Sequence, residues 1–261
     1  MKERGCSISA ESIDREAWTH GVTDRVNKLR DQYWLCTPTI DTERAVSYTK
    51  TYKENEAKDA CIKRARALYD YLSVRTINIL PNELIVGTYG KQPRSVLVSP
   101  EVLISWYKDE LDTMATRPQD PYQISEEDKE ILKAEVFPYW EGKTMEDYYI
   151  ANLSEDVKSV AYNTGIVFGE CKSQAGAGEF AADFSGIILK KGFKALKEEA
   201  TLRLNELDRE DVSNFDQRLF YQSVIICCDA AKVLADRYAE KALELSKEEK
   251  DPERQKELLK I

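Results

Sequence analysis

Histidine is almost absent from this sequence: His20 is the only one in 261 residues. The six cysteines are scattered and form no C-x-x-C pair; they are Cys6, Cys36, Cys61, Cys171, Cys227 and Cys228. Protein zinc sites need several Cys or His ligands held close together. The composition therefore predicts no metal site, and the cysteines are typical of reduced, mostly buried thiols in a cytosolic protein.

Positive charge and long apolar runs are also scarce. The chain has 38 Lys and Arg residues against 47 Asp and Glu residues, which gives a net charge of −9. A nucleic-acid backbone requires a basic surface, so nucleic acid is excluded as the main partner. No run approaches the ~20 apolar residues that span a membrane, and the N-terminal residues lack the apolar core of a secretory signal. We therefore expect a cytoplasmic protein that is not inserted in a membrane.

Most of what is present has the pattern of amphipathic helices. Val22, Val26, Leu29 and Tyr33 recur at the spacing of one helix face, and Pro38 ends that pattern. Further helices are predicted to begin at Asp41 or Thr42, near Asp59, at Pro100, at Ser125, after Thr144, at Ile187, at Phe215 and after Asp251. Residues 1–21 are polar and irregular, and we expect them to form a mobile arm.

One segment departs from the helical pattern. Residues 79–90, ILPNELIVGTYG, contain Pro, Asn and two Gly around the apolar run Leu84–Val86. This arrangement predicts a short strand or an extended core segment at that run. The predicted fold is therefore mainly α with a few short strands.

An aromatic group lies near the end of one predicted helix and comprises Tyr139, Trp140, Tyr148 and Tyr149. Such a group can form a cation-binding box. Aromatic residues at helix ends more often pack helices against one another. We interpret this group as core packing.

The most unusual stretch is rich in glycine. Residues 171–191 read CKSQAGAGEFAADFSGIILKK, with Gly176 and Gly178 on either side of one alanine and Glu179 directly after them. Glycines let a backbone approach a ligand closely, and the stretch lacks the G-x-x-x-x-G-K-[ST] spacing of a phosphate-binding loop. The carboxylate is either held in a pocket or solvated on a surface loop, and the residues alone leave both readings open.

Several stretches resemble a known family when they are read together. They are NELIVGTYGKQPRS (82–95), PEVLISWYKDELDTMATRPQDPYQISEEDK (100–129) and FPYWEGKT (137–144), supported by RVNKLRDQYW (25–34), IDTERA (40–45) and RYAEKALELSKEE (237–249). In order and spacing they resemble the N-terminal region of the glycyl radical enzymes. The branch is the pyruvate formate-lyase-like one, which contains choline trimethylamine-lyase and the coenzyme-B12-independent glycerol and propanediol dehydratases. The run DELDTMATRPQDPY looks closest to the choline lyase.

The resemblance implies a fold and a chemistry. Residues 22–261 would form the N-terminal portion of a pyruvate formate-lyase-like domain, the helical part of a large α/β barrel. In that family a glycine near the C-terminus stores a radical, which an iron–sulfur, S-adenosylmethionine-dependent activating enzyme installs. A cysteine then becomes a thiyl radical that takes a hydrogen atom from a small-molecule substrate. The implied partners are the remainder of the polypeptide and the activating enzyme, and a homodimer or a bacterial microcompartment stays open.

The catalytic motifs of that family are absent from this sequence. It contains no G-C-V-E and no R-V-x-G-Y motif, and Ser173 stands where a glutamate would follow Cys171. The last predicted helix reaches Ile261 without a capping residue. We therefore expect a fragment that binds no cofactor by itself and has no turnover alone.

The resemblance also gives the glycine-rich stretch a role. In the implied alignment, anchored on ILKKG (188–192), Glu179 falls where the choline lyase carries an aspartate facing the trimethylammonium group and the diol dehydratases carry a histidine. Cys171 falls where a tyrosine lines the choline pocket, so the sequence departs from the choline pattern there. The predicted substrate-binding residues are thus Glu179, Cys171 and Gly178.

Three functions fit these observations. The first is the N-terminal part of a C–N lyase for a small cationic amino alcohol, which Glu179 favours because a neutral diol would leave a buried carboxylate uncompensated. The second is the same part of a glycerol or propanediol dehydratase, which loses water. The third is an acidic helical interaction module, which the helix from Phe215 and the net charge allow but the ordered motifs do not explain.

Overall fold

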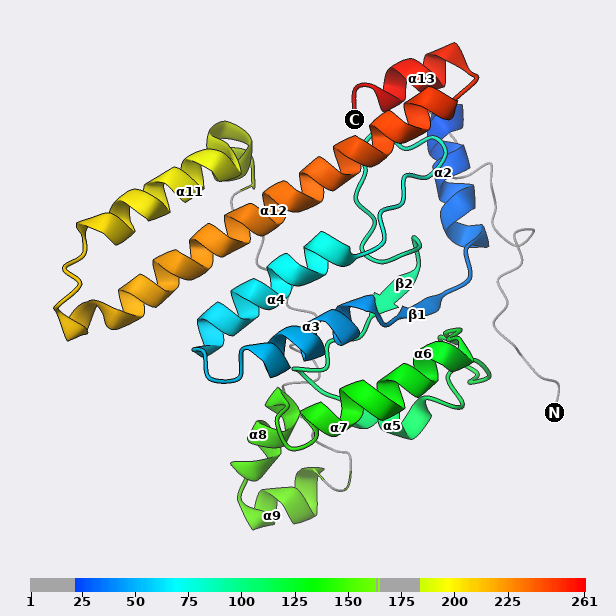
Figure 1. Ribbon diagram of the computed structural model, residues 1–261. Coiled ribbons are helices and arrows are strands. Elements are labelled where there is room, and N and C mark those ends of the chain that lie inside the picture. Colours follow the sequence, from blue (N-terminus) through cyan, green and yellow to red (C-terminus); the bar gives the residue numbers. More distant parts are fainter. Residues whose placement is uncertain (1–21, 163, 165–183) are drawn as a thin grey trace, which may run out of the picture.

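Helices and one two-stranded sheet make up the part of the chain that the computed structural model describes, residues 22–162, 164 and 184–261 (Figure 1). The α-helices are α2 (Asp24–Leu35), α3 (Glu43–Glu54), α4 (Ala60–Val74), α5 (Ser105–Glu110), α6 (Glu126–Ile131), α7 (Phe137–Trp140), α8 (Met145–Ala151), α9 (Glu155–Val157), α11 (Leu189–Glu206), α12 (Phe215–Glu248) and α13 (Pro252–Leu258). Short π-helical or 3-10 turns are η1 (Leu132–Val136), η2 (Lys158–Tyr162), η3 (Phe184–Ile188) and η4 (Val212–Asn214). The expectation of a mainly α fold is confirmed, whereas residues 1–21, including His20, lie outside the described residues.

The sheet lies elsewhere than predicted. Strands β1 (Thr39–Asp41) and β2 (Ser95–Leu97) pair in parallel, with Ile40 opposite Val96. The prediction of a strand at Leu84–Val86 is wrong: the chain bends at Leu84 and Ile85, whose side chains are 51% and 93% exposed, and Gly87 follows with a positive φ of 126°. The true strands are three residues long, too short to show an alternating pattern in the sequence.

Most predicted helix starts are confirmed by their caps. The Ser125 hydroxyl accepts a hydrogen bond from the Asp128 N–H at 3.0 Å. Thr42 occupies the cap position of α3, but the bond is made by Asp41, whose Oδ1 accepts from the Glu43 N–H at 3.0 Å. Asp41 and Thr42, the two residues predicted for this helix start, therefore both contribute to it.

The predicted helix start at Pro100 is wrong, since α5 begins only at Ser105. In a helix begun at Pro100, the carbonyls of Glu101 and Val102 would accept from N–H groups four residues on. They instead accept from the first N–H groups of α8, those of Met145 and Glu146, each at 3.0 Å. This tertiary contact replaces the first helical turn.

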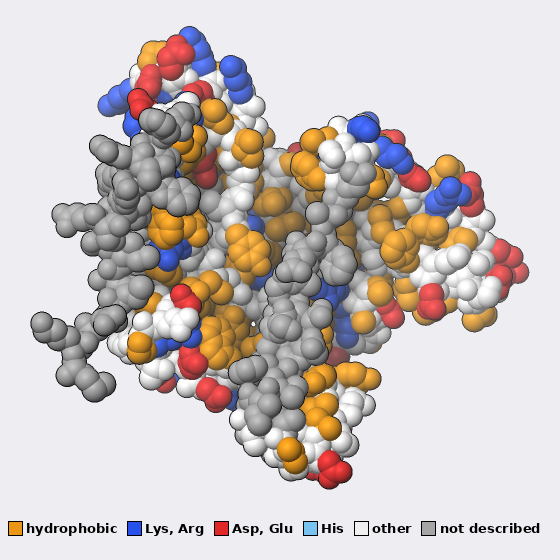
Figure 2. Space-filling view, turned by 180° about the vertical axis from the view of Figure 1, so that it is seen from behind, with side chains coloured by type: hydrophobic (Ala, Val, Ile, Leu, Met, Phe, Trp, Pro, Cys, Tyr) orange, Lys and Arg blue, Asp and Glu red, His pale blue; other side chains and the backbone are white. Residues whose placement is uncertain are grey.

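Large apolar side chains are exposed over much of the surface, and Figure 2 shows them in orange across the face seen from behind. The first predicted helix is an example, because Val26 and Tyr33 of its apolar stripe are 50% and 46% exposed. These exposures do not amount to a membrane segment. Throughout the described ranges, no helix combines the length and the apolar character needed to cross a membrane.

The described cysteines are free thiols in different surroundings. Cys228 is buried, Cys36 and Cys227 are half-buried, and Cys61 is exposed. Burial raises the pKa of the Cys227 and Cys228 thiols. The expectation of burial is wrong for Cys61, which lies in the first turn of α4 where its N–H binds the cap Asp59.

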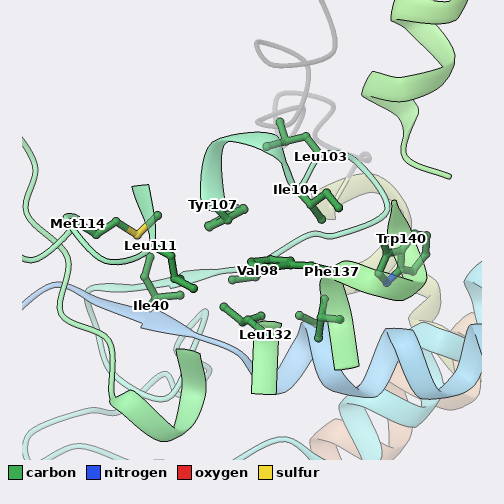
Figure 3. Packing of buried hydrophobic residues seen from close by; sticks show 12 residues of the cluster. Ile40, Val98, Leu103, Ile104, Tyr107, Leu111, Met114, Leu132, Phe137 and Trp140 are labelled. Atoms are coloured by element: carbon green, nitrogen blue, oxygen red, sulfur yellow. The ribbon is translucent and has the colours of Figure 1, made fainter. Parts of the chain in front are cut away.

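The main core lies between the sheet, helices α3, α5 and α7, and the π-helical turn η1 (Figure 3). Its buried residues are Ile40, Ala45, Val98, Leu103, Ile104, Tyr107, Leu111, Met114, Leu132, Val136, Phe137 and Trp140. Trp140 is 3% exposed, and its indole N–H donates to the Thr49 hydroxyl at 2.9 Å. Core packing is thus confirmed for Trp140. It is wrong for Tyr148, which is 74% exposed because it lies two positions from the buried Glu146 and so on the other side of α8.

The long helix α12 lies between α4 and α11 and packs against both (Figure 1). The Arg237 guanidinium donates to the carbonyls of Leu72 and Arg75 at 2.7 and 2.8 Å, which ties α12 to the end of α4. Helix α13 folds back on α12 and buries Leu258 against Tyr238. Helices α4, α11 and α13 thus all pack against α12.

The last helix starts where predicted but ends early. Asp251 caps it, and it ends at Leu258. The Lys260 N–H donates to the Glu257 carbonyl, three residues back instead of four, at 2.9 Å. Such a tightened turn closes helices, so the expectation of a helix interrupted at Ile261 is wrong.

Buried tyrosines should make this fold sensitive to alkali. Burial raises the pKa of Tyr71 and of Tyr107 from 10 to about 12. Unfolded tyrosine ionises first, so the stability that these groups contribute is complete below pH 10 and is lost as the pH rises to 12. Together they should lower the free energy of unfolding by about 2.7 kcal/mol per pH unit in that window.

Tyr71→Phe should halve this fall. The Tyr71 hydroxyl is buried and has no hydrogen-bond partner among the described residues, so its removal should cost little at neutral pH. Urea unfolding of both chains at several pH values above 9 measures the difference. An unchanged slope in Tyr71→Phe would contradict the account.

Candidate functional site

The predicted substrate-binding residues Glu179, Cys171 and Gly178 lie outside the described residues. The structure describes the segments on either side, η2 before them and η3 after them. The described residues that bear on this site are the segments flanking it and the stretches that carry the family resemblance.

The frame after the glycine-rich stretch is fixed at one glycine. Gly192 has a φ of 74° and a ψ of 164°, a conformation that favours glycine, and it kinks α11 near its start. Past the kink, the Lys197 ammonium binds the Asp229 carboxylate of α12 at 2.6 and 2.8 Å. The run ILKKG (188–192) thus stands directly before a fixed pair of helices.

Residues 40–45, which we call the hub, join the stretches that carry the resemblance. Asp41 is 2% exposed. One of its carboxylate oxygens accepts from the Lys91 N–H at 2.8 Å, and the other caps α3. The hub thereby fixes the stretch 82–95 against β1.

Arg44 fixes the hub to the stretch 100–129. Its guanidinium makes a two-pronged ion pair with the Glu101 carboxylate, with Nη1 3.0 Å from Oε2, and the two side chains are only 13% and 10% exposed. It also lies 3.8 Å from the centre of the Tyr48 ring. Burial acts to lower the pKa of Arg44, but the hydrogen bond and charge of Glu101 outweigh it and raise the pKa. Arg44 therefore stays charged, and the pair has a structural role.

The other polar residues of the hub are also engaged. The Thr42 hydroxyl donates to the Asp128 carboxylate at the start of α6. The Glu43 carboxylate accepts from the Thr76 N–H at 2.8 Å. These motif residues hold the fold together rather than offering free acids or bases.

A groove of about 690 Å³ lies beside the hub, between α3, α4 and α6. Its lining includes five carboxylates and two lysines: Glu43, Glu54, Asp70, Glu127, Asp128, Lys50 and Lys91. Some are already paired, since Asp70 accepts from the Thr51 hydroxyl at 2.7 Å. Within the described residues, no group of three or more His, Cys, Asp or Glu side chains is placed to hold a metal ion. The groove offers polar contacts but no assembled catalytic group.

Gly90 lies close to the hub residue Asp41, within the stretch 82–95. A Cβ built there would lie 2.5 Å from the Ser95 Cβ and 2.9 Å from the Asp41 Oδ2. Both neighbours belong to strands, Asp41 to β1 and Ser95 to β2, so making room for the Cβ would disturb the sheet. We expect Gly90→Ala to lower the free energy of unfolding by about 1–3 kcal/mol. Urea denaturation of the two chains measures this, and equal midpoints would contradict it.

Comparison with known proteins assigns the chain to a family. The model of the pyruvate formate lyase-like family matches residues 17–261. The chain belongs to the pyruvate formate lyase-like family. That match leaves the third expected function, an acidic helical interaction module, without support. The family match begins at residue 17, inside the predicted arm of residues 1–21.

Three relatives of the pyruvate formate lyase-like family illustrate the likeness. The trans-4-hydroxy-L-proline dehydratase of Clostridioides difficile is 34% identical over 243 residues, 92% of this chain and 30% of that protein. The (2S)-3-sulfopropanediol dehydratase of Klebsiella oxytoca is 32% identical over 239 residues, 90% of this chain and 29% of that protein. The isethionate sulfite-lyase of Nitratidesulfovibrio vulgaris is 30% identical over 253 residues, 94% of this chain and 30% of that protein.

Solved structures of the family agree. The glycerol-bound form of the B12-independent glycerol dehydratase from Clostridium butyricum superposes with a TM-score of 0.82 at 36% identity, over 90% of this chain and 30% of that one. The hydroxyproline dehydratase from Clostridioides difficile with trans-4-hydroxy-L-proline bound gives a TM-score of 0.82 at 33% identity, over 92% of this chain and 30% of that one. The chain thus spans about 30% of the length of these relatives. Its helices correspond to part of the glycyl radical enzyme barrel.

Proposed function

We propose that this chain is the N-terminal part of a glycyl radical dehydratase, which removes water from a small hydroxylated substrate. The observation that carries this proposal is that most of the relatives described above are dehydratases, the isethionate sulfite-lyase being the exception. Hydroxyproline, sulfopropanediol and glycerol dehydratases are 32% to 36% identical to about nine tenths of this chain. The first expectation, a choline-type C–N lyase, has no such support among the relatives described above. The second expectation, loss of water, therefore takes its place.

Glu179 narrows the proposed substrate class. A buried carboxylate is costly unless a positive charge compensates it, and a neutral diol has none. A substrate with a hydroxyl and an ammonium group fits both observations. The ammonium would compensate the charge of Glu179, and the hydroxyl could leave as water, as the names of the dehydratase relatives imply. Trans-4-hydroxy-L-proline, whose ring nitrogen is protonated at neutral pH, is a compound of that class. In this proposal Cys171 and Gly178 line the same pocket.

The chemistry belongs to the part of the enzyme beyond this chain. A thiyl radical there would take a hydrogen atom from a substrate carbon, and the neighbouring hydroxyl would leave with a proton as water. The resulting product radical would then take the hydrogen atom back from the cysteine thiol, which regenerates the thiyl radical. A glycine would store the radical, and an iron–sulfur activating enzyme would install it. The described residues supply the frame: the hub, the core and the α11–α12 pair that follows the glycine-rich stretch. A homodimer and a location in the cytoplasm or a microcompartment stay predictions.

A substrate panel tests the proposal. The full-length protein, activated under anaerobic conditions, is incubated separately with trans-4-hydroxy-L-proline, glycerol and choline. We expect a dehydrated product from the hydroxylated amine, a weaker reaction with glycerol, and no trimethylamine from choline. Trimethylamine release without any dehydration would overturn the proposal and restore the C–N lyase.

A further inference from the structure

One face of α12 carries a continuous apolar stripe. It consists of residues spaced three or four apart: Phe220, Val224, Cys227, Ala231, Leu234, Tyr238, Ala242 and Leu245. At about 100° per residue, all of them lie within roughly 40° of one line along the helix. We call this set the α12 stripe. A stripe of this kind marks a face that packs against another element.

The C-terminal half of the stripe is covered within this chain. Tyr238 and Ala242 are only 5% and 1% exposed. They pack with Ile79, which follows α4, and with Leu258 of α13, and Ile261 packs against the same cluster. Here the stripe behaves as its sequence pattern predicts.

The N-terminal half has the same pattern but is open. Phe220 is 61% exposed, and Val224, Cys227 and Ala231 are half-buried. Helices α4 and α11 pack against α12 and the turn η4 lies at its start, yet the Phe220 side chain stays 61% exposed. Continuous apolar surface of this kind marks a contact with another segment or protein.

We propose that the segment of the full-length enzyme that directly follows Ile261 packs along the open half of the α12 stripe. This rests on the proposed function, because the relatives are about three times as long as the match to this chain. Helix α13 runs back along α12, and Figure 1 shows the C-terminus beside α12 on the side toward the α11–α12 hairpin. Ile261 and Leu234 pack against the same cluster, so a chain that continued from Ile261 toward the start of α12 would meet Ala231, Cys227 and Phe220 in that order.

The chemistry of the contact is apolar. The charge pair near this part of the helix, Lys197 with Asp229, is already satisfied within the chain. The docking segment should therefore present apolar side chains at helical or strand spacing, without a matching charge. Such a contact would extend the cluster around Tyr238 into one core that runs the length of α12.

Photo-crosslinking in the full-length protein tests the proposal. Phe220→p-benzoylphenylalanine places a reactive ketone in the open half of the stripe. The matched control is Gln222→p-benzoylphenylalanine, because Gln222 is exposed but lies about 200° further round the helix. After irradiation, digestion and mass spectrometry, we expect the Phe220 variant to be joined to residues shortly after position 261 of the same chain. The control should lack that product.

Each other outcome overturns the proposal. A crosslinked dimer would place a second copy on the stripe, and a crosslink inside residues 1–261 would place another part of this chain there. No crosslink would show an open surface, and absence of any polypeptide beyond position 261 would remove the occupant. If the enzyme turns over but the crosslink maps elsewhere, the docking proposal fails and the proposed function stands. If the crosslink is found after position 261 but no substrate is dehydrated, the proposed function fails and the docking proposal stands.

Discussion

Glu101→Gln should lower the free energy of unfolding by about 3–5 kcal/mol, since it leaves a buried guanidinium without its counter-charge. Arg44 and Glu101 are 13% and 10% exposed, and their two-pronged contact joins α3 to the segment before α5. Urea denaturation of the wild-type and variant chains, followed by circular dichroism, measures the change. The size of the effect would show that the IDTERA motif acts as a structural hub.

An exposed pair provides the matched control. Lys108 and Glu141 lie 2.9 Å apart, but their side chains are 41% and 68% exposed. Solvent screens such a pair, so Glu141→Gln should cost only about 0–1 kcal/mol. Equal effects of the two substitutions would contradict the structural role assigned to Arg44 and Glu101.

Glu179→Gln in the full-length enzyme should selectively lower kcat/KM for a substrate that carries an ammonium group. A cation about 4 Å from a carboxylate gains roughly 4 kcal/mol at an effective dielectric near 20. Desolvation offsets much of this, which leaves ~1–3 kcal/mol, or about a ten- to a hundred-fold change in kcat/KM. The neutral amide keeps the shape of the side chain, so a diol such as glycerol should be affected far less. The measurement is kcat/KM for trans-4-hydroxy-L-proline and for glycerol with both enzymes.

A second substitution at this position sharpens the test. Glu179→His introduces the residue that the resemblance places in the diol dehydratases, so it should move the preference toward glycerol. If Glu179→Gln leaves the ratio between the two substrates unchanged, the residue is a solvated surface carboxylate. The proposal of a charged substrate would then lose its local support.

Helix starts could be read from the sequence because the signals are local. Ser125 and Asp251 cap the helices that their positions predict, since the bonds run to N–H groups two or three residues on. The helix at Pro100 could not be read, because the carbonyls of Glu101 and Val102 bind α8 more than forty positions away. Long-range contacts overrode a local signal there.

The hub could not be found from spacing. Arg44 and Glu101 lie 57 positions apart, and Thr42 and Asp128 lie 86 apart, so no periodicity connects them. The available signal was the order of the motifs that resemble the family. The substrate-binding residues depend on that resemblance alone, because Glu179, Cys171 and Gly178 lie outside the described residues. Their placement in a pocket stays a prediction.

Electron paramagnetic resonance tests the central claim, that this chain is one part of a longer radical enzyme. The 261-residue chain and the full-length protein are each incubated anaerobically with the activating enzyme, S-adenosylmethionine and a reductant. We expect a glycyl radical doublet from the full-length protein, whose sequence beyond position 261 should contain the G-C-V-E and R-V-x-G-Y motifs, and no doublet from the chain alone. A doublet from the chain alone, or a full-length protein with neither motif nor radical, would contradict the account.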